Sequence, residues 1–105
     1  MSVTYAIEFT LRDGARERFL ALLGGVLDAM RREPTFVDAV LHDDPSDPNR
    51  FFLHETWDSH DEVVNVQVNR PYRAGFHAAL PDLLAAERRI GVWRPIRRDG
   101  PAVRR

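Results

Sequence analysis

The sequence predicts an α+β domain of the ferredoxin-like type, and three observations lead to this class. Stretches with strand-like and helix-like patterns follow one another in the order βαββαβ. The chain has 105 residues, of which 44% are hydrophobic, and this is the size of a single domain. Apolar side chains occupy both sides of the predicted sheet, whereas the helices suffice to cover one side. We therefore expect a homodimer of the dimeric α/β-barrel type.

The first strand and the first helix are predicted from the spacing of apolar residues. Apolar and polar side chains alternate over residues 3–9, which is the period of a strand. The Asp-Gly pair at 13–14 is expected to form a turn and to cap a helix over residues 15–32, where apolar residues recur every three or four positions. Gly24 and Gly25 each cost this helix roughly 1 kcal/mol relative to alanine. We interpret them as a sign that the helix approaches the sheet closely.

A hairpin is expected in the middle of the chain. Pro34 ends the first helix, and residues 35–42 and 50–57 have the composition of strands. The seven residues between them, 43–49, are rich in Asp, Pro, Ser and Asn, which favour turns. The two strands are therefore predicted to be antiparallel and joined by a loop of about seven residues.

An interrupted helix and a last strand complete the predicted order. Ser59 and Glu62 have the spacing of a capping box and open a second helix, which Pro71 interrupts. A further helical segment follows over residues 72–84, and residues 89–96 are predicted to close the sheet.

Composition excludes several kinds of function. The chain has no cysteine, so it has no disulfide bonds, no thiolate nucleophile and no cysteine-based metal site. The net charge is −1, and the arginines are mixed with acidic residues, whereas a nucleic-acid-binding protein normally has a basic face. We expect no nucleic acid and no cysteine-bound metal, and the lack of a Gly-rich phosphate loop and of a nucleotide-binding motif is consistent with no cofactor.

The two ends of the chain suggest its boundaries and its compartment. Residues 1–97 are interpreted as the domain, and residues 98–105 as a flexible, solvated basic tail. The first nine residues alternate and include Glu8, which fits neither a signal peptide nor a membrane span. The expected location is the cytoplasm, without contact with a membrane.

From the hairpin onwards the sequence resembles the antibiotic biosynthesis monooxygenase superfamily. The resemblance rests on Asp-Pro turns at 44–45 and 47–48, followed by Phe51, Leu53, Glu55, Trp57, Ser59, the pair Pro71-Tyr72, and Phe76. It implies a homodimer with a pocket between the sheet and the helices. Several members oxidise quinols or phenolic polyketides with molecular oxygen and neither metal nor flavin. The expected partners are therefore a small aromatic substrate and molecular oxygen, consistent with a pocket that deprotonates a phenol and excludes water.

The candidate catalytic residues lie in the interrupted helix. His77 is a candidate general base, and the alternative is a histidine on the helix surface. Tyr72 is a candidate donor to a substrate oxygen, although an aromatic side chain on that stripe also suits the core. The amides of Gln67, Asn65 and Asn69 are candidates for orienting substrate oxygens.

The remaining candidates are expected to bind the substrate. Trp57, Phe76 and Trp93 are predicted to form an aromatic wall. His54 lies on the strand opposite His42, and the two are expected to face each other on the sheet. Two histidines without a third ligand make a poor metal site, so no metal is expected there.

Two other functions are compatible with the same fold. One is a dimeric, non-catalytic module that binds a small ligand or acts in the stress response. This alternative is favoured because many members of the superfamily have a histidine where this sequence has Gln67. The other is haem degradation, since haem-degrading relatives hold iron with a histidine near the position of His77. Those relatives also carry an asparagine in the first strand and a tryptophan in place of Gln67, where this sequence has Ile7, Glu8 and glutamine.

Overall fold

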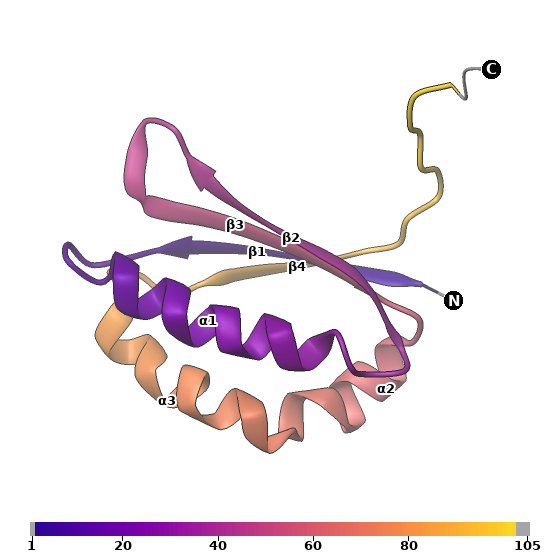
Figure 1. Ribbon diagram of the computed structural model, residues 1–105, viewed down its shortest axis with the longest axis horizontal. Coiled ribbons are helices and arrows are strands. Elements are labelled where there is room, and N and C mark those ends of the chain that lie inside the picture. The colour runs from indigo at the N-terminus through magenta and orange to yellow at the C-terminus, as the bar shows by residue number, and fades with distance from the viewer. Residues whose placement is uncertain (1, 103–105) are drawn as a thin grey trace.

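The computed structural model describes residues 2–102 and has the predicted order of elements (Figure 1). This order confirms the α+β, ferredoxin-like fold. The elements are β1 (Val3–Thr10), α1 (Arg16–Met30), β2 (Phe36–Asp44), β3 (Asp47–Trp57), α2 (His60–Asn65), the single 3-10 turns η1 (Gln67–Asn69) and η2 (Pro71–Arg73), α3 (Ala74–Leu83) and β4 (Arg89–Trp93).

The four strands form one antiparallel sheet in the order β2-β3-β1-β4. The three helices lie on one side of this sheet, and no described helix lies on the other (Figure 1). The central strand β1 alternates as expected: Val3, Tyr5, Ile7 and Phe9 are buried beneath the helices. Side chains of the intervening residues face the opposite side, which we call the open face.

Four phenylalanines join the two layers. Phe19 of α1 lies between Phe9 of β1 and Phe51 of β3, with ring centroids 5.0 and 4.9 Å apart, and Phe76 of α3 lies 6.2 Å from Phe9. All four are buried. Full burial of each such side chain contributes roughly 1.5–3 kcal/mol to the free energy of unfolding. These contacts hold α1 and α3 against the sheet. Two short turns, η1 and η2, separate α3 from α2.

The hairpin between β2 and β3 is tighter than predicted. The strands continue to Asp44 and from Asp47, so residues 45–46 alone form the loop in place of the predicted seven residues. Each aspartate accepts a hydrogen bond from the backbone N–H two residues further on, which closes the turn. Pairing of the strands shifts next to Asp44, so Pro48 lies in an irregular part of the ladder where its missing N–H is tolerated.

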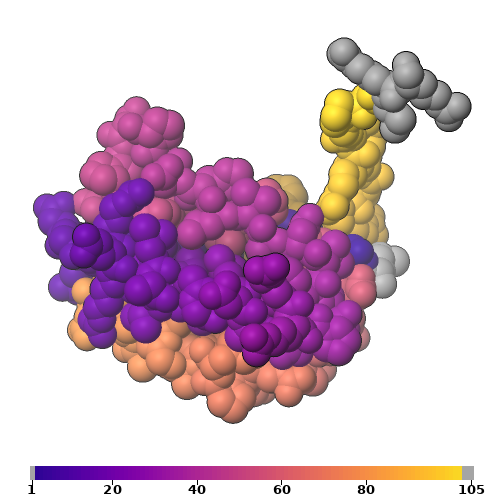
Figure 2. All heavy atoms as spheres, viewed as in Figure 1, coloured from indigo at the N-terminus to yellow at the C-terminus, as the bar shows by residue number. Residues whose placement is uncertain are grey.

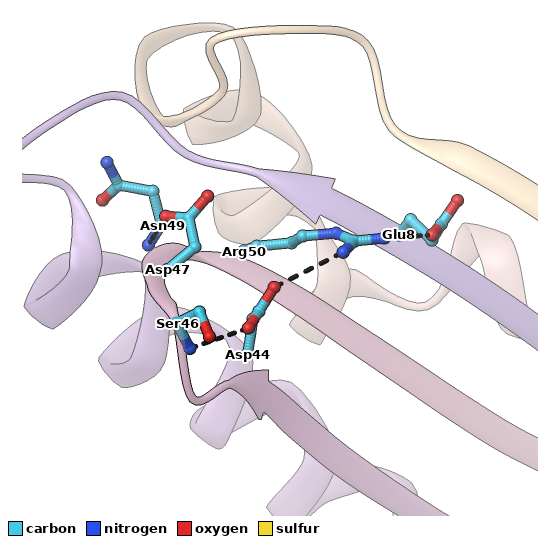
Figure 3. Close-up of polar contacts among 6 residues, drawn as sticks. All are labelled: Glu8, Asp44, Ser46, Asp47, Asn49 and Arg50. Atoms are coloured by element: carbon cyan, nitrogen blue, oxygen red, sulfur yellow. Dashed lines mark hydrogen bonds and ion pairs between the residues drawn. The ribbon is translucent and has the colours of Figure 1, made fainter.

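Ion pairs fasten this hairpin to β1 on the open face. The guanidinium of Arg50 lies 3.3 Å from a carboxylate oxygen of Glu8 and 3.4 Å from one of Asp44 (Figure 3). All three strands are thus linked through one side chain. The groups are largely exposed, so we expect about 1 kcal/mol or less from each pair.

Two expectations about the first helix were wrong. Asp13 does not cap α1: its carboxylate accepts a hydrogen bond from Asn49, and the cap residue Ala15 makes no side-chain bond. Gly14 adopts a φ of 81°, which explains the glycine in the turn. A Cβ added to Gly24 or Gly25 would have no atom within 4 Å among its surroundings. Close approach to the sheet is therefore not the reason for these two glycines.

The last strand is shorter than predicted. β4 ends at Trp93 in place of residue 96, because Pro95 has no N–H for the ladder and restricts Arg94 before it. The following segment projects from the molecule at the upper right of Figure 2, and the hairpin tip projects at the upper left. Its Arg98 lies 3.2 Å from Asp38 of β2. Of the predicted tail, Arg104 and Arg105 lie outside the described residues.

The open face carries apolar and imidazole side chains. Val40, Phe52 and Trp93 are its large exposed apolar residues, and Ala6 lies between them in the register of the strands. The rings of His42 and His54 are neighbours there, with centroids 5.4 Å apart. Within residues 2–102 no helix is long and apolar enough to cross a lipid bilayer.

Candidate functional site

On the helix side of the sheet, β4 is only partly covered. Ile90 and Val92 pair with Ile7 and Tyr5 and so face the helices, yet they are 51% and 58% exposed. Two hollows lie along this edge. The larger hollow, about 580 Å³, is lined by His77, Leu80, Pro81, Leu84, Ala85, Ala86, Glu87, Arg88 and Ile90. The smaller hollow, about 450 Å³, is lined by Ser2, Val3, Ser59, His60, Asp61, Val92, Trp93 and Arg94.

A buried carboxylate lies on β3, which β1 separates from this edge. Glu55 of β3 is paired with Tyr5 of β1 and is 6% exposed. Its side chain accepts a 3.2 Å hydrogen bond from the indole N–H of Trp57. Burial raises the pKa of Glu55, while the charges of Arg73 and Arg88 and the bond from Trp57 oppose this effect. The charges of two guanidinium groups thus act on this carboxylate.

Of the two arginines, Arg73 has the less usual environment for a guanidinium group. It is buried, and its Nε and Nη2 atoms have no hydrogen-bond partner within residues 2–102. The guanidinium carbon lies 5.8 Å from the ring centroid of Trp57 and 5.4 Å from that of Tyr72. These aromatic faces favour the cation but do not satisfy its N–H donors. The arrangement suits a ligand oxygen or a water molecule that accepts from them.

Arg88 and His77 belong to the larger hollow itself. Burial lowers the pKa of Arg88, and the charge of Glu55 opposes this effect. Burial also lowers the pKa of His77, and the positive charges of Arg88 and Arg73 lower it further. Both effects shift His77 towards the neutral imidazole, which is the form that accepts a proton. A base and two cations act on one region between α3 and the sheet.

Gln67 and Tyr72 form a separate, internal network. Gln67 is fully buried, and its amide nitrogen donates to Glu33 at 2.8 Å and to Glu62 at 2.9 Å. Its amide oxygen accepts a 3.1 Å bond from the Tyr72 hydroxyl. Glu33 also pairs with Arg70, 3.3 Å away. Both amide hydrogens of Gln67 are thus in use, and the network holds the turn η2 that presents Arg73.

The other residues proposed from the sequence are dispersed. Asn65 and Asn69 are exposed on the outer surface, where the Asn69 amide donates to the Asn65 carbonyl at 3.4 Å. Trp57 and Phe76 are buried in the core. His54 lies on the open face, across the sheet from His77.

Trp93 also turns towards the open face. A Cβ added to Gly91 would lie 2.7 Å from the indole nitrogen of Trp93, so the indole covers Gly91 closely. Gly91 pairs with Ala6, whose side chain is on the open face. The indole is therefore positioned on that side of β4, and a side chain at position 91 would have to displace it.

Sequence reasoning missed four residues at this edge: Tyr5, His60, Arg73 and Arg88. Tyr5 was interpreted as one of the apolar residues of the first strand. His60 follows the cap of α2, and its Nδ1 lies 2.7 Å from the hydroxyl of Tyr5. Arg73 could have been found from the sequence, because it directly follows Tyr72, a candidate site residue in the interrupted helix. For Arg88, in the loop before β4, the sequence contains no comparable signal.

Comparisons with known proteins agree with this fold. The sequence profile of the family described as "Antibiotic biosynthesis monooxygenase" matches residues 2–79. A Pestalotiopsis microspora protein named "Putative monooxygenase" is 29% identical over 93 residues, which cover 88% of this chain and 78% of that protein.

Two solved structures show the same arrangement of elements. The structure of Rv0793 from Mycobacterium tuberculosis has a TM-score of 0.83 at 20% identity, covering 95% of this chain and 100% of that one. The structure of SnoaB, a cofactor-independent oxygenase from Streptomyces nogalater, has a TM-score of 0.78 at 22% identity, covering 92% and 95%. At these identities the likeness concerns the fold alone.

Proposed function

The chain belongs to the antibiotic biosynthesis monooxygenase family, and we propose that it is a cofactor-independent monooxygenase acting on a small aromatic hydroquinone or phenol with molecular oxygen. One observation carries this proposal. His77 lines the larger hollow together with Arg88, and the buried Arg73, whose charge also lowers the pKa of His77, has N–H donors without a partner among residues 2–102. Such a site can take a proton from a phenol and stabilise the phenolate that forms.

Each of these side chains has a role in the proposed mechanism. His77 accepts the phenolic proton, because its lowered pKa keeps the imidazole neutral. Arg88 and Arg73 stabilise the phenolate oxygen by charge and by N–H donation. The apolar wall of Leu80 and Ile90 holds the ring and limits access of water to it.

The chemistry requires no electron donor besides the substrate. The phenolate gives one electron to molecular oxygen, and the resulting pair combines into a carbon–oxygen bond, which leaves a ring-bound peroxide. The ring carbon then loses its hydrogen as a proton while the oxygen–oxygen bond breaks, and the outer oxygen leaves as water. The net reaction converts a phenol with a free ortho or para C–H and one O₂ into a quinone and one H₂O. A hydroquinone, whose para carbon carries the second hydroxyl, reacts at an ortho C–H and gives a hydroxyquinone and one H₂O. The ring supplies all the electrons.

Gln67 and Tyr72 are positioning residues in this proposal. Their hydrogen-bond network holds η2, which presents Arg73 next to Glu55. Since the bonds of Gln67 are internal, we assign it no contact with the substrate. Asn65 and Asn69, on the outer surface, receive no role in the mechanism.

We further propose that a second copy of this chain covers the open face. Val40, Phe52 and Trp93 are exposed there, and the neighbouring His42 and His54 add aromatic surface. A small domain with a sheet uncovered on one side gains apolar burial when it pairs with a copy of itself. The lining of the larger hollow, on the helix side, shares no residue with this face, whereas Trp93 belongs to both the face and the smaller hollow.

Oxygen uptake by the purified, metal-free protein tests the function. A panel of hydroquinones and phenols is supplied, and each rate is corrected for spontaneous oxidation. We expect protein-dependent uptake that a chelator does not reduce, with one water formed per O₂ and no accumulation of hydrogen peroxide. Uptake at the background rate across the panel would instead favour the non-catalytic binding module.

A further inference from the structure

Tyr5 and His60 form a hydrogen-bonded pair at the smaller hollow. The hydroxyl oxygen of Tyr5 lies 2.7 Å from Nδ1 of His60, and their ring centroids are 5.9 Å apart. Tyr5 is a buried residue of β1, whereas His60 begins α2, is exposed and lines the hollow. The pair connects the helix-facing side of the sheet to the protein surface. It does not contribute to the lining of the larger hollow that contains His77.

The position of the proton in this pair follows from the surroundings of Tyr5. Burial raises the pKa of its phenol, and the nearby carboxylate of Glu55 raises it further, so the hydroxyl keeps its hydrogen. Within residues 2–102, Nδ1 of His60 is the one hydrogen-bond partner found for that hydroxyl. We infer that the hydroxyl donates and Nδ1 accepts, because the reverse direction would leave the hydroxyl hydrogen without an acceptor among residues 2–102. In a neutral imidazole the hydrogen is then on Nε2, at the opposite edge of the ring from Tyr5.

We propose that His60, held by Tyr5 in the Nε2–H form, is the hydrogen-bond donor of a second ligand site that takes the carbonyl oxygen of a flat, neutral aromatic ketone or quinone. Val3 and Val92 form the apolar wall of this site. Asp61 and Arg94, which carry opposite charges, both line it, so the hollow favours a neutral ligand over an anion. An N–H donor held in one orientation next to an apolar wall suits an acceptor on a flat, largely apolar molecule, and Ser2, Ser59 and Arg94 are further polar groups of the lining.

This site is independent of the proposed oxygenation, since binding of a ketone involves no electron transfer. If the proposed function holds, the same site suits the quinone product, whose oxygens are acceptors only. The phenolic substrate, by contrast, needs an acceptor for its proton, which is the role assigned to His77 at the larger hollow.

A titration of the ¹⁵N-labelled full chain with 1,4-naphthoquinone tests the site by NMR. The chain has no cysteine that would react with a quinone. Before any addition, the long-range ¹⁵N–¹H pattern of His60 should be that of the Nε2–H form. During the titration, shifts should concentrate on His60, Val3 and Val92, and the signal of the His60 ring should move most.

Three variants separate the donor from the fold. His60→Ala should weaken naphthoquinone binding roughly threefold to tenfold, as expected for a lost hydrogen bond. His60→Gln, which also carries an N–H donor, should restore part of the affinity. Tyr5→Phe keeps the buried ring but should mix the two neutral forms of His60, which the ¹⁵N pattern detects directly. His77→Ala is the matched control and should leave binding at the smaller hollow unchanged.

The results distinguish this site from the proposed function. Equal affinity in His60→Ala, shifts confined to residues of the larger hollow, or an Nδ1–H pattern in the unliganded protein would each overturn the second site. Background-rate oxygen uptake together with a His60-dependent titration would overturn the oxygenase and leave the second site intact.

Discussion

The indole N–H of Trp57 donates a 3.2 Å hydrogen bond to the buried carboxylate of Glu55, two residues away on the same strand. Both side chains face the helices, and the guanidinium of Arg73 lies 5.8 Å from the Trp57 ring. Glu55 and Trp57 are both part of the pattern that resembles the family. The pattern thus places a carboxyl group, in addition to the apolar indole ring, beneath the proposed site. The pH dependence of stability and the role of Arg73 follow from this arrangement.

Glu55→Gln should change how stability depends on pH. Because burial raises the pKa of Glu55 in the folded protein above its unfolded value, its favourable contribution is complete below the unfolded pKa. That contribution is lost as the pH rises through the folded pKa. Relative to the wild type, Glu55→Gln should therefore become more stable as the pH rises from about 4 to 7. Urea unfolding at several pH values measures the difference, and a constant difference would contradict the expectation.

Arg73→Met should weaken binding of a phenolate while leaving the fold intact. Methionine keeps part of the buried volume and removes donors that lack a partner within residues 2–102. Absorbance titration with 4-nitrophenol should show that the wild type lowers the pKa of the bound phenol. We expect the variant to bind the phenolate roughly tenfold to hundredfold less tightly, a range typical of lost charged hydrogen bonds. Arg18→Met, exposed on α1, is the matched control, and equal losses in both variants would refute the role of Arg73.

His77→Ala should lower turnover roughly a hundredfold, because the site loses its proton acceptor. The effect should be largest near neutral pH, and in the wild type the rate should fall as acid protonates His77. His42→Ala, on the open face, removes a histidine far from the larger hollow and serves as control. Unchanged turnover in His77→Ala would remove that residue from the mechanism.

Val40→Arg should separate the proposed dimer into monomers. Val40 is 42% exposed on the open face, where an arginine would place a charge inside the interface. Val64→Arg on α2 is a matched control, since Val64 is 43% exposed on the helix side. Sedimentation velocity should give a dimer for the wild type and the control. A monomeric wild type would contradict the assigned partner of the open face.

Two glycine substitutions should act in opposite directions. Gly25→Ala should raise the free energy of unfolding by about 0.5–1 kcal/mol, because the added methyl group meets open space in the middle of α1. Gly91→Ala should displace the indole of Trp93, which lies 2.7 Å from the added Cβ. Urea unfolding and tryptophan fluorescence measure these effects. No fluorescence change in Gly91→Ala would show that the indole does not lie over Gly91 in solution.

Local patterns were sufficient for the elements of this fold. The alternation along β1 and the three- and four-residue spacing along α1 depend on which face of each element is buried, so they are written into consecutive residues. Ser59 caps α2, since its hydroxyl oxygen accepts from the Glu62 N–H at 3.2 Å. Only this half of the predicted capping box is found among residues 2–102, because the Glu62 carboxylate accepts from Thr35 and Gln67. The length of the hairpin loop was predicted wrongly, because it depends on the hydrogen bonds that the side chains of Asp44 and Asp47 accept within the turn.

The site depended on tertiary structure. Tyr5, Glu55, Arg73 and Arg88 come from four separate segments, and their charges act on one another only because β1 lies between β3 and β4 beneath the helices. Gln67 looked available for a substrate, yet Glu33, more than thirty residues earlier, occupies its amide. By itself the sequence determined the fold, its two-sided apolar sheet and the candidate histidine. The partners of each polar side chain were decided by packing, because hydrogen bonds and charges act through space and leave no period along the chain.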